Sequence, residues 1–284
     1  MTTAFLGPRG TFSEEAALAH AGVDGDLLPF TSFPAITSAV ETGLADEALL
    51  PIENSIEGAV SGTLDLLIHE TPLKIAGERT VPVRHFLIGT PGASFAEITV
   101  VSSHPQPFGQ CRRFLERCLP KADQIAALST ATAVQETVEA GDPTRAAIGT
   151  ARAAALYGGL ILARDIQDVR ANLTRFVVLA RHDHPPTGDD KTSIGFTMKA
   201  NVPGALHGIL EAFAAEKLQM TKVESRPTKA WLGEYVFLVD LEGHRQDPAV
   251  ARALDRIRDS CALLKVFGSY PRFPLETLRD LVDE

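Results

Sequence analysis

Neutral hydroxyl and amide side chains recur just after the apolar segments in the first two thirds of the chain. The sets are Thr11 with Glu14, Asn54 with Glu57, Ser103 with Gln106, and the adjacent Ser129 and Thr130. Such residues are typical of helix starts, and the backbone N–H groups of a helix start can bind a small anion. They favour recognition of a carboxylate or phosphate by neutral donors, although they would also cap the helices of any α/β protein.

Signatures of several other chemistries are missing from the sequence. The segment GPRGTFS (7–13) lacks the ending of a phosphate loop, and no G-x-G-x-x-G follows the first apolar segment. Neither H-E-x-x-H nor G-x-S-x-G is present, which argues against zinc and serine hydrolases. By residue type alone, Thr174 is a β-branched residue that opens a strand and Arg175 is a surface charge.

Short apolar runs alternate with amphipathic segments up to about residue 180. The predicted strands are Thr3–Leu6, Glu47–Leu50, Lys74–Ala76, His85–Ile88, Ile98–Val101, Ile125–Ala127, Ala146–Ile148 and Phe176–Leu179. The predicted helices are Phe12–Ala21, Phe33–Thr42, Gly62–His69, Pro107–Cys118, Thr130–Ala140 and Thr150–Leu156. This alternation is typical of βαβ units, in which helix starts follow the carboxyl ends of strands. We therefore expect the capping motifs to converge on one crevice.

The last third of the sequence has a different order of elements. The predicted strands are Thr192–Met198, Leu218–Glu224, Tyr235–Leu241 and Leu263–Phe267, and the predicted helices are Pro203–Ala215 and Pro248–Ser260. The order βαββαβ is ferredoxin-like and leaves an open sheet edge that favours self-association. The preceding segment HDHPPTGDDK (182–191) is interpreted as a solvated linker, since its histidines have no further metal ligands nearby.

Length and composition are those of a globular protein with about two domains. The chain has 284 residues, of which 45% are hydrophobic, enough for a sizeable core. Its net charge of −9 makes nucleic acid and anionic membranes unexpected partners. Three cysteines without a CxxC pair, the lack of a signal-peptide pattern and the lack of a long apolar run favour a cytoplasmic protein without a metal site.

As a set, the motifs resemble those of prephenate dehydratases. In the first part they are GPRGTFSEEAA (7–17), LPIENSIEGAV (50–60), SSHPQPFGQC (102–111), LSTATAV (128–134) and LTRF (173–176). The second part has NVPGAL (201–206), VESRP (223–227) and FGSYP (267–271), which are similar to the phenylalanine-binding ACT domain of that family. The resemblance is to the monofunctional form, since no chorismate mutase segment is seen before it.

This resemblance implies an α/β fold whose catalytic part has two lobes, like a type II periplasmic binding protein, followed by a ferredoxin-like ACT domain. The implied catalytic domain spans 1–185, with the first lobe at about 1–77 plus 175–185 and the second at about 78–174. A linker at 186–191, the ACT domain at 192–270 and a tail at 271–284 are expected to follow, and the tail is expected to contain a short helix.

The activity implied by the resemblance is the decarboxylating dehydration of prephenate to phenylpyruvate in phenylalanine biosynthesis. Aromatisation drives this reaction, so no cofactor is implied. Thr174 would donate a hydrogen bond that strengthens as charge builds on the departing oxygen, and Arg175 would pair with the side-chain carboxylate. The other implied substrate contacts are Thr11, Asn54, Ser55, Ser103, Gln110, Ser129, Thr130 and Phe176. Neutral donors suit the ring carboxylate, because a cation there would stabilise the ground state more than the transition state.

The resemblance also implies feedback inhibition by L-phenylalanine, bound between the ACT domains of two chains in a homodimer or homotetramer. The implied effector contacts are Asn201, Gly204, Ala205 and Leu206 at a helix start, and Glu224, Ser225 and Arg226 at a strand end. Two alternatives stay open on the sequence alone. One is an arogenate dehydratase, whose substrate has the same reactive ring, and the other is a non-catalytic amino-acid sensor.

Overall fold

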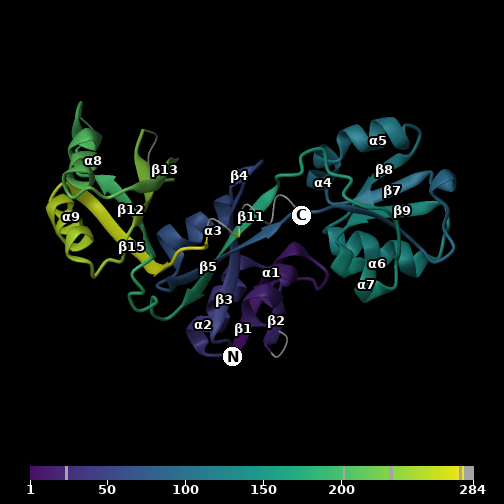
Figure 1. Ribbon diagram of the computed structural model, residues 1–284, viewed down its shortest axis with the longest axis horizontal. Helices are drawn as coiled ribbons and strands as arrows, with labels where there is room; N and C mark the ends of the chain where they lie inside the picture. Colours follow the sequence, from purple (N-terminus) through teal and green to yellow (C-terminus); the bar gives the residue numbers. More distant parts are fainter. Residues whose placement is uncertain (23–24, 201, 230–232, 275–276, 278–284) are drawn as a thin grey trace.

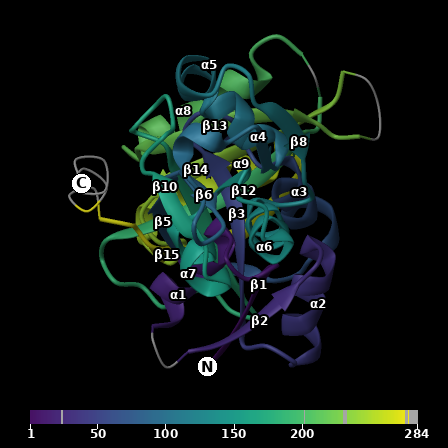
Figure 2. The ribbon, with the colours of Figure 1, turned by 90° about the vertical axis from the view of Figure 1, so that its right-hand side faces the viewer.

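The computed structural model describes residues 1–22, 25–200, 202–229, 233–274 and 277. These residues form three bodies that follow one another along the long axis of the molecule (Figure 1), and Figure 2 views the molecule along that axis. The first lobe lies at the centre and carries the N-terminus, with the second lobe on one side and the C-terminal domain on the other.

The first lobe is built on a mixed sheet with the strand order β2-β1-β3-β11-β5, and β4 pairs with β3. Its strands are β1 (Thr2–Leu6), β2 (Asp26–Phe30), β3 (Glu47–Asn54), β4 (Gly58–Ala59), β5 (Lys74–Pro82) and β11 (Leu173–Ala180). Its helices are α1 (Phe12–Ala21), α2 (Phe33–Thr42), α3 (Ser61–Asp65) and a π-helical turn at Leu66–Glu70. Strands β1, β2 and β3 are parallel, whereas β11 is antiparallel to both of its neighbours.

The second lobe has a sheet with the order β10-β6-β9-β7-β8. Its strands are β6 (Phe86–Gly89), β7 (Val100–Ser103), β8 (Asp123–Ala126), β9 (Arg145–Gly149) and β10 (Leu160–Ala163). Its helices are α4 (Pro105–Gln110), α5 (Arg112–Cys118), α6 (Thr130–Ala140), α7 (Ala151–Tyr157) and a 3-10 turn at Phe95–Glu97. Two lobes joined by two chain crossings are the arrangement implied by the family resemblance.

The crossings between the lobes lie several residues away from the expected boundaries on the β5 side. Strand β5 remains in the first sheet as far as Pro82, because β11 pairs with it from Leu173↔Pro82 to Ala180↔Lys74. The expected boundary after residue 77 therefore falls inside a paired strand. The chain crosses at residues 83–85 and returns at residues 164–172, so Thr174 lies inside β11 of the first sheet rather than at the end of the second lobe.

The C-terminal domain has the expected βαββαβ order. Its elements are β12 (Asp190–Met198), α8 (Ala205–Ala215), β13 (Met220–Pro227), β14 (Tyr235–Glu242), α9 (Pro248–Arg258) and β15 (Cys261–Pro271). The strand order is β13-β14-β12-β15. Apolar residues of α8 and α9, among them Phe213 and Leu254, cover one face of this sheet. Strand β12 begins at Asp190, within the expected linker, and most of the expected tail lies outside the described residues.

The other face of the C-terminal sheet packs on the first lobe. Leu238, Phe267 and Tyr270 share a buried cluster with Leu67 and Ile75 of the first lobe. Next to them the two backbones meet at Gly268, where an added Cβ would stand 2.1 Å from the carbonyl oxygen of Ile75. The C-terminal domain and the first lobe therefore share a hydrophobic core.

Several elements of the fold differ from those predicted from sequence, and three of these differences have a local explanation. Strand β2 is not among the predicted strands. It contains Pro29, which lowers strand propensity but is tolerated because β2 is an edge strand. Strand β10 is not among the predicted strands either. It forms the end of the apolar run that begins in α7, and Gly158 and Gly159 separate the strand from that helix. The predicted helix at 107–118 is two helices that meet at Cys111, whose ψ of 18° departs from helical geometry.

Candidate active site

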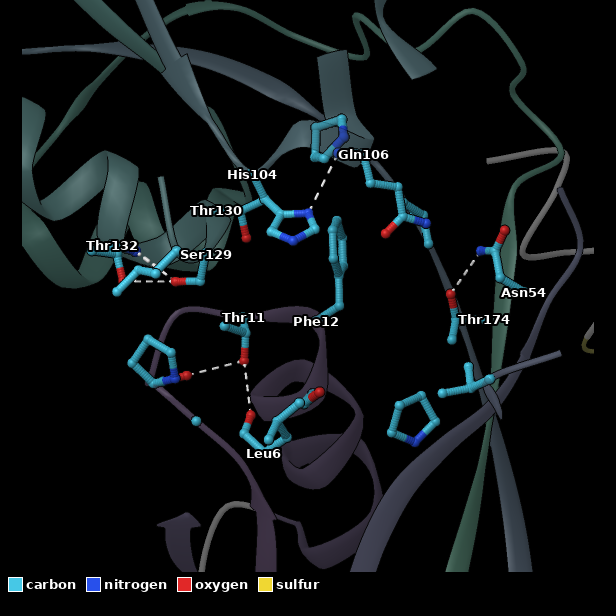
Figure 3. Close-up of a pocket in the computed structure, with 18 of the residues that line it drawn as sticks. Leu6, Thr11, Phe12, Asn54, His104, Gln106, Ser129, Thr130, Thr132 and Thr174 are labelled. Atoms are coloured by element: carbon cyan, nitrogen blue, oxygen red, sulfur yellow. Dashed lines mark hydrogen bonds between the residues drawn. The ribbon is translucent and has the colours of Figure 1, made fainter. Parts of the chain in front are cut away.

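A cavity of about 900 Å³ opens between the two lobes (Figure 3). Its walls include helix starts from both lobes and Thr174 near the start of β11. Six of the ten residues expected to contact a substrate line it: Thr11, Asn54, Gln110, Ser129, Thr130 and Thr174. This cavity is the candidate active site.

Asn54 and Thr174 form a cross-strand pair in the cavity wall. Asn54 Nδ2 donates to Thr174 Oγ1 at 2.9 Å (Figure 3). The backbone N–H groups of Ile56 and Glu57 both donate to Asn54 Oδ1 at 3.0 Å, which turns the NH₂ side of the amide toward Thr174. Because Thr174 Oγ1 accepts from Asn54, its own hydrogen can be donated to a ligand in the cavity.

Side-chain amides carry hydrogen bonds from this pair to the second lobe. Asn172 Oδ1 accepts from Asn54 Nδ2 at 2.8 Å, and Asn172 Nδ2 donates to Gln110 Oε1 at 3.3 Å. Gln110 Oε1 also lies 2.8 Å from His85 Nε2, and Gln110 Nε2 donates to Glu57 Oε1 at 3.2 Å. Gln110 thus lines the cavity but is held by protein groups from both lobes.

His85, which lines the cavity, is a neutral imidazole. Burial lowers its pKa, which keeps the ring uncharged at pH 7. Since Gln110 Oε1 can only accept, the ring proton lies on Nε2. Nδ1 has no hydrogen-bond partner among the described residues, and Phe12 packs edge-on against the ring at 5.6 Å. The ring therefore fixes Gln110 by a neutral hydrogen bond.

Two helices of ten and eleven residues begin at the cavity. Thr11 Oγ1 accepts from Glu14 N and caps α1, and Ser129 Oγ accepts from Thr132 N and caps α6. The first N–H groups of a helix have no partner within it and carry partial positive charge. The expected convergence of capped helix starts is therefore observed for α1 and α6 (Figure 3).

Fixed charge is scarce on the cavity wall. Among the described residues that line it, the ionisable side chains are those of His85 and His104, and neither Lys nor Arg is present. Backbone N–H groups, hydroxyls and amides are thus the donors that the wall offers to an anion.

Beside the cavity, the turn before α1 touches the second lobe directly. Thr150 Oγ1 donates to the carbonyl oxygen of Gly10 at 2.8 Å. Gly10 has a φ of +85°, and an added Cβ would lie 3.1 Å from Ala153 Cβ and 3.3 Å from Ala131 Cβ. A glycine here allows the two lobes to approach this closely.

Two carboxylates of α1 extend the same contact. Glu14 accepts from Gly10 N at 2.7 Å and from Arg152 Nε of the second lobe at 3.2 Å. Its neighbour Glu15 is half-buried beside Thr150, and desolvation raises the pKa of Glu15 to about 7, with the nearby Glu14 charge acting in the same direction. The lobes are therefore joined by one fixed ion pair and one carboxyl group that titrates near neutrality.

The structure contradicts the expectation that Arg175 pairs with a substrate carboxylate. Neighbouring residues of a strand face opposite sides of the sheet, so Thr174 faces the cavity and Arg175 faces the C-terminal domain. Arg175 donates to Glu78 at 2.6 Å, to Asp240 at 2.9 Å and to the hydroxyl of Tyr270 at 2.8 Å. Arg175 is not among the residues that line the cavity.

Three further residues expected at the substrate have structural partners instead. Phe176 is 1% exposed and lies in the core beneath α1. Ser103 is completely buried and donates to the carbonyl oxygen of Ile148 at 2.9 Å. Ser55 Oγ bridges the returning crossing, because it donates to Ala171 O and accepts from Leu173 N. None of the three lines the cavity, which corrects their expected substrate contacts.

The described residues among those expected at the effector site lie toward one end of the C-terminal sheet. Ser225 of β13 and Phe196 of β12 pair with Phe237 from opposite sides of β14, so both strands end at the same end of the sheet, and α8 starts from that end of β12. Gly204 caps α8 with a φ of +85°, and Ala205 and Leu206 form its first turn. Glu224 and Arg226 contact each other at 3.8 Å. Asn201 lies outside the described residues.

Sequence reasoning missed several residues of the cavity. His85, His104 and Thr132 line it, and Asn172 connects its two walls. His104 and Thr132 lie inside two of the motifs already singled out, so motif membership could have identified them. Nothing local marks His85 or Asn172, because their partners lie 25 to 118 positions away in the sequence.

The described residues contain neither a cluster of metal-ligating side chains nor a membrane-spanning helix. No group of three or more His, Cys, Asp or Glu side chains is placed to hold a metal ion in this part of the chain. Within the same described ranges, no helix has the length and apolar character needed to cross a bilayer.

Comparisons with known proteins agree with this architecture. The sequence profile of the family described as "Prephenate dehydratase" matches residues 3–184, and the profile described as "ACT domain" matches residues 192–259. A "Prephenate dehydratase" of Mycolicibacterium vanbaalenii is 40% identical over 94% of this chain and 90% of its own length. A "Bifunctional chorismate mutase/prephenate dehydratase" of Aquifex aeolicus is 42% identical over 96% of this chain and 74% of its own length.

Solved structures share the whole fold. The prephenate dehydratase of Arthrobacter aurescens in complex with L-Phe has a TM-score of 0.88 and 37% identity, covering 96% of this chain and 90% of its own. A protein described as "GqqA- a novel type of quorum quenching acylases" has a TM-score of 0.86 and 33% identity, covering 97% of this chain and 100% of its own. The lobes, the cavity and these matches together place the chain in the prephenate dehydratase family, with an ACT domain after its catalytic part.

Proposed function

We propose that this protein is a prephenate dehydratase whose catalytic residue is Thr174. The observation that carries the proposal is the hydrogen bond from Asn54 Nδ2 to Thr174 Oγ1, which leaves the hydroxyl hydrogen of Thr174 to be donated into the cavity. Family membership and the position of Thr174 at the cavity between the lobes support the same role.

The reaction breaks two bonds of the substrate ring. The C–O bond to the ring hydroxyl breaks, and this oxygen leaves as water after taking up one proton. The C–C bond to the ring carboxylate breaks as well, releases carbon dioxide, and supplies its electron pair to the ring as it becomes aromatic. A hydrogen bond from Thr174 strengthens as negative charge develops on the departing oxygen, and this lowers the barrier.

Binding of a dianion by this cavity depends on neutral donors. The starts of α1 and α6 offer backbone N–H groups together with the residues Thr11, Ser129 and Thr130. We propose that the two substrate carboxylates are bound there and along the amide wall at Gln110. A neutral surround leaves the ring carboxylate free to lose its charge in the transition state, whereas a paired cation would hold that charge in place.

The proposed function is tested by following phenylpyruvate formation from prephenate by ultraviolet absorbance. Replacing Thr174 by Val preserves the shape of the side chain and removes the hydroxyl, so we expect kcat to fall by about 100-fold or more with little change in KM. Thr174→Ser keeps the hydroxyl and is the matched control. A Thr174→Val protein with normal kcat and a raised KM would contradict the catalytic assignment, and absence of phenylpyruvate with the unsubstituted protein would contradict the function.

The regulatory part of the proposal is feedback inhibition by L-phenylalanine at the ACT domain. It is supported by the ACT profile match and by the related structure described as a complex with L-Phe. We assign the effector contacts to Gly204, Ala205, Leu206 and the end of β13 at Glu224–Arg226, since the N–H groups at the start of α8 suit a carboxylate. Asn201 belongs to the same proposed site.

Assembly through the ACT domains and a cytoplasmic location complete the proposal. Within the described residues β13 pairs with β14 alone, so its other edge can pair with a second copy. Val223 on β13 is 54% exposed, which supplies apolar surface at this edge. Cysteines that are all unpaired fit a reducing compartment.

A further inference from the structure

The residues next to the Asn54–Thr174 pair form a second cross-strand pair on the opposite face of the same sheet. In the register of β3 and β11, Thr174 pairs with Asn54 and Arg175 pairs with Glu53. The side chains of Arg175 and Glu53 approach to 3.7 Å. One pair faces the cavity and the next faces the ACT domain, so a shift in one must move the backbone of the other.

Arg175 closes a ring of hydrogen bonds with three strands of the ACT sheet. It donates to Asp240 of β14 at 2.9 Å and to Tyr270 of β15 at 2.8 Å. Ser193 of β12 donates to Asp240 at 2.5 Å, and its oxygen lies 2.7 Å from the Tyr270 hydroxyl. Since the one hydroxyl hydrogen of Ser193 goes to Asp240, Tyr270 donates to Ser193 and accepts from Arg175. Each donor in the ring is thus used once.

Burial makes this ring difficult to break. The side chain of Arg175 is 16% exposed, that of Asp240 9% and that of Glu78 3%. Lys191 also binds Glu78, at 3.0 Å, and the cations beside Asp240 and Glu78 keep the pKa of both carboxyls below the usual range. Separating a buried charge from its partner is strongly unfavourable. A movement of the ACT sheet must therefore carry Arg175 with it.

A second connection leaves Glu53 for the strand of the proposed effector site. Lys222 Nζ of β13 lies 3.2 Å from Glu53 Oε2 and 3.2 Å from Glu224 Oε2. Glu224 is one of the residues assigned to the effector. Lys222 thus contacts both the strand end where L-phenylalanine is proposed to bind and the residue that precedes Asn54.

We propose that the Glu53–Arg175 pair couples the ACT domain to the Asn54–Thr174 pair, with Lys222 and Tyr270 as its positioning residues. The inference rests on the proposed function. An effector that displaces β13 or turns the ACT sheet carries Lys222 and Arg175 with it and so shifts their contacts with Glu53. That change moves Asn54 and Thr174 relative to the substrate, and by reciprocity a bound substrate changes the affinity for the effector.

The test measures inhibition and effector binding separately in the full-length protein. In the wild-type protein, saturating L-phenylalanine should lower kcat/KM by about 5- to 150-fold, the usual range of allosteric coupling. We expect Lys222→Gln and Tyr270→Phe to abolish nearly all of this decrease. Calorimetry should show that both variants still bind L-phenylalanine. Lys222→Arg keeps the charge and should restore the inhibition. In the absence of effector, Tyr270→Phe should lower kcat more than it changes KM, because it acts on the position of Thr174.

A matched control comes from another ion pair of the same domain. Arg252 binds Glu216 at 2.7 Å and is 62% exposed, away from the first lobe, so Arg252→Gln should leave inhibition unchanged. Full inhibition of Lys222→Gln and Tyr270→Phe by L-phenylalanine would contradict the proposed coupling. So would a wild-type protein that binds L-phenylalanine without any change in turnover. Neither result would contradict the dehydratase activity. Absence of phenylpyruvate formation in the wild-type protein would instead contradict the proposed function.

Discussion

At the scale of single residues, two neighbours in β11 have separate roles. Thr174 faces the cavity and accepts from Asn54, while Arg175 faces the ACT domain and is held by Glu78 and Asp240. A substitution of either residue therefore probes a different surface. Effects on chemistry are expected from the Asn54–Thr174 pair, whereas substitution of Arg175 is expected to affect packing and regulation.

The orientation of the Asn54 amide gives a sharp prediction. Asn54→Asp keeps the acceptor that binds the N–H groups of Ile56 and Glu57 but replaces the donor to Thr174 by a carboxylate oxygen. Thr174 would then donate to this oxygen instead of to the substrate. We expect kcat for prephenate to fall by about 100-fold in steady-state kinetics.

Ser103→Ala provides the matched control for Asn54→Asp. Ser103 was expected at the substrate but is buried beneath the wall, so its loss should cost about 1 kcal/mol of stability with kcat and KM unchanged. A large fall in kcat for Ser103→Ala, or none for Asn54→Asp, would show that the cavity wall has been assigned incorrectly.

At the scale of elements, the start of α1 contributes both to the cavity and to the contact between the lobes. It presents N–H groups to the cavity, and its preceding turn touches α6 and α7 of the second lobe. The distance between the lobes at this contact therefore affects the distance between the donors of α1 and those of α6.

Gly10 provides a test of this contact. Gly10→Ala places a methyl group against Ala153 and Ala131, so we expect the lobes to separate and KM for prephenate to rise. Gly22 ends α1 with a φ of +75° and has nothing within 4 Å of an added Cβ. Gly22→Ala therefore also places a side chain at a positive φ, but without the clash. Equal KM values in the two variants would argue against the contact.

Glu15 gives the same contact a dependence on pH. Its pKa rises from 4.5 to about 7 on folding, mainly because the group is buried. The folded protein therefore holds this proton more tightly than the unfolded chain does. The stabilisation is complete below pH 4.5 and is lost as the pH rises through 7, by up to about 3 kcal/mol.

Glu15→Gln removes the titrating group and tests that dependence. Urea denaturation at pH 5 and pH 8 should show a smaller loss of stability for Glu15→Gln than for the wild-type protein. Glu116→Gln, at a carboxylate that is 64% exposed, is the control and should follow the wild-type protein. If the free energy of unfolding of Glu15→Gln differed between pH 5 and pH 8 as much as that of the wild-type protein, Glu15 would not be the cause of the pH dependence.

At the scale of the whole molecule, the three bodies are joined in different ways. The first lobe and the ACT domain share a hydrophobic cluster and a buried ion network. The two lobes meet through crossings, amide hydrogen bonds and the contact at Gly10. The ACT domain is thus tightly coupled to β5 and β11 of the first lobe, while the cavity can also change by movement of the second lobe.

The free edge of β13 predicts how copies assemble. Val223→Lys puts a charge on this exposed edge, so light scattering should report a smaller particle than for the wild-type protein at the same concentration. Leu263 is 39% exposed on β15 at the other side of the sheet, and Leu263→Lys is the control. An unchanged mass for Val223→Lys would place the interface elsewhere.

The sequence by itself determined the alternation of strands and helices, the two-part organisation and six residues of the cavity wall. The capping motifs at Thr11 and Ser129 act over three residues, so their helix starts are readable from local spacing. The strand that holds Thr174 is marked by its own apolar run. Even the opposite directions of Thr174 and Arg175 follow from the two-residue period of a strand.

What lies against each face was decided only by the tertiary structure. Arg175 finds Asp240 and Tyr270 at separations of 65 and 95 residues, and Asn54 finds Asn172 at a separation of 118. No local pattern encodes such pairs, because they depend on how complete lobes and domains pack. The arginine expected to pair with a substrate carboxylate instead pairs with carboxylates of the protein, Glu78 of the first lobe and Asp240 of the ACT domain.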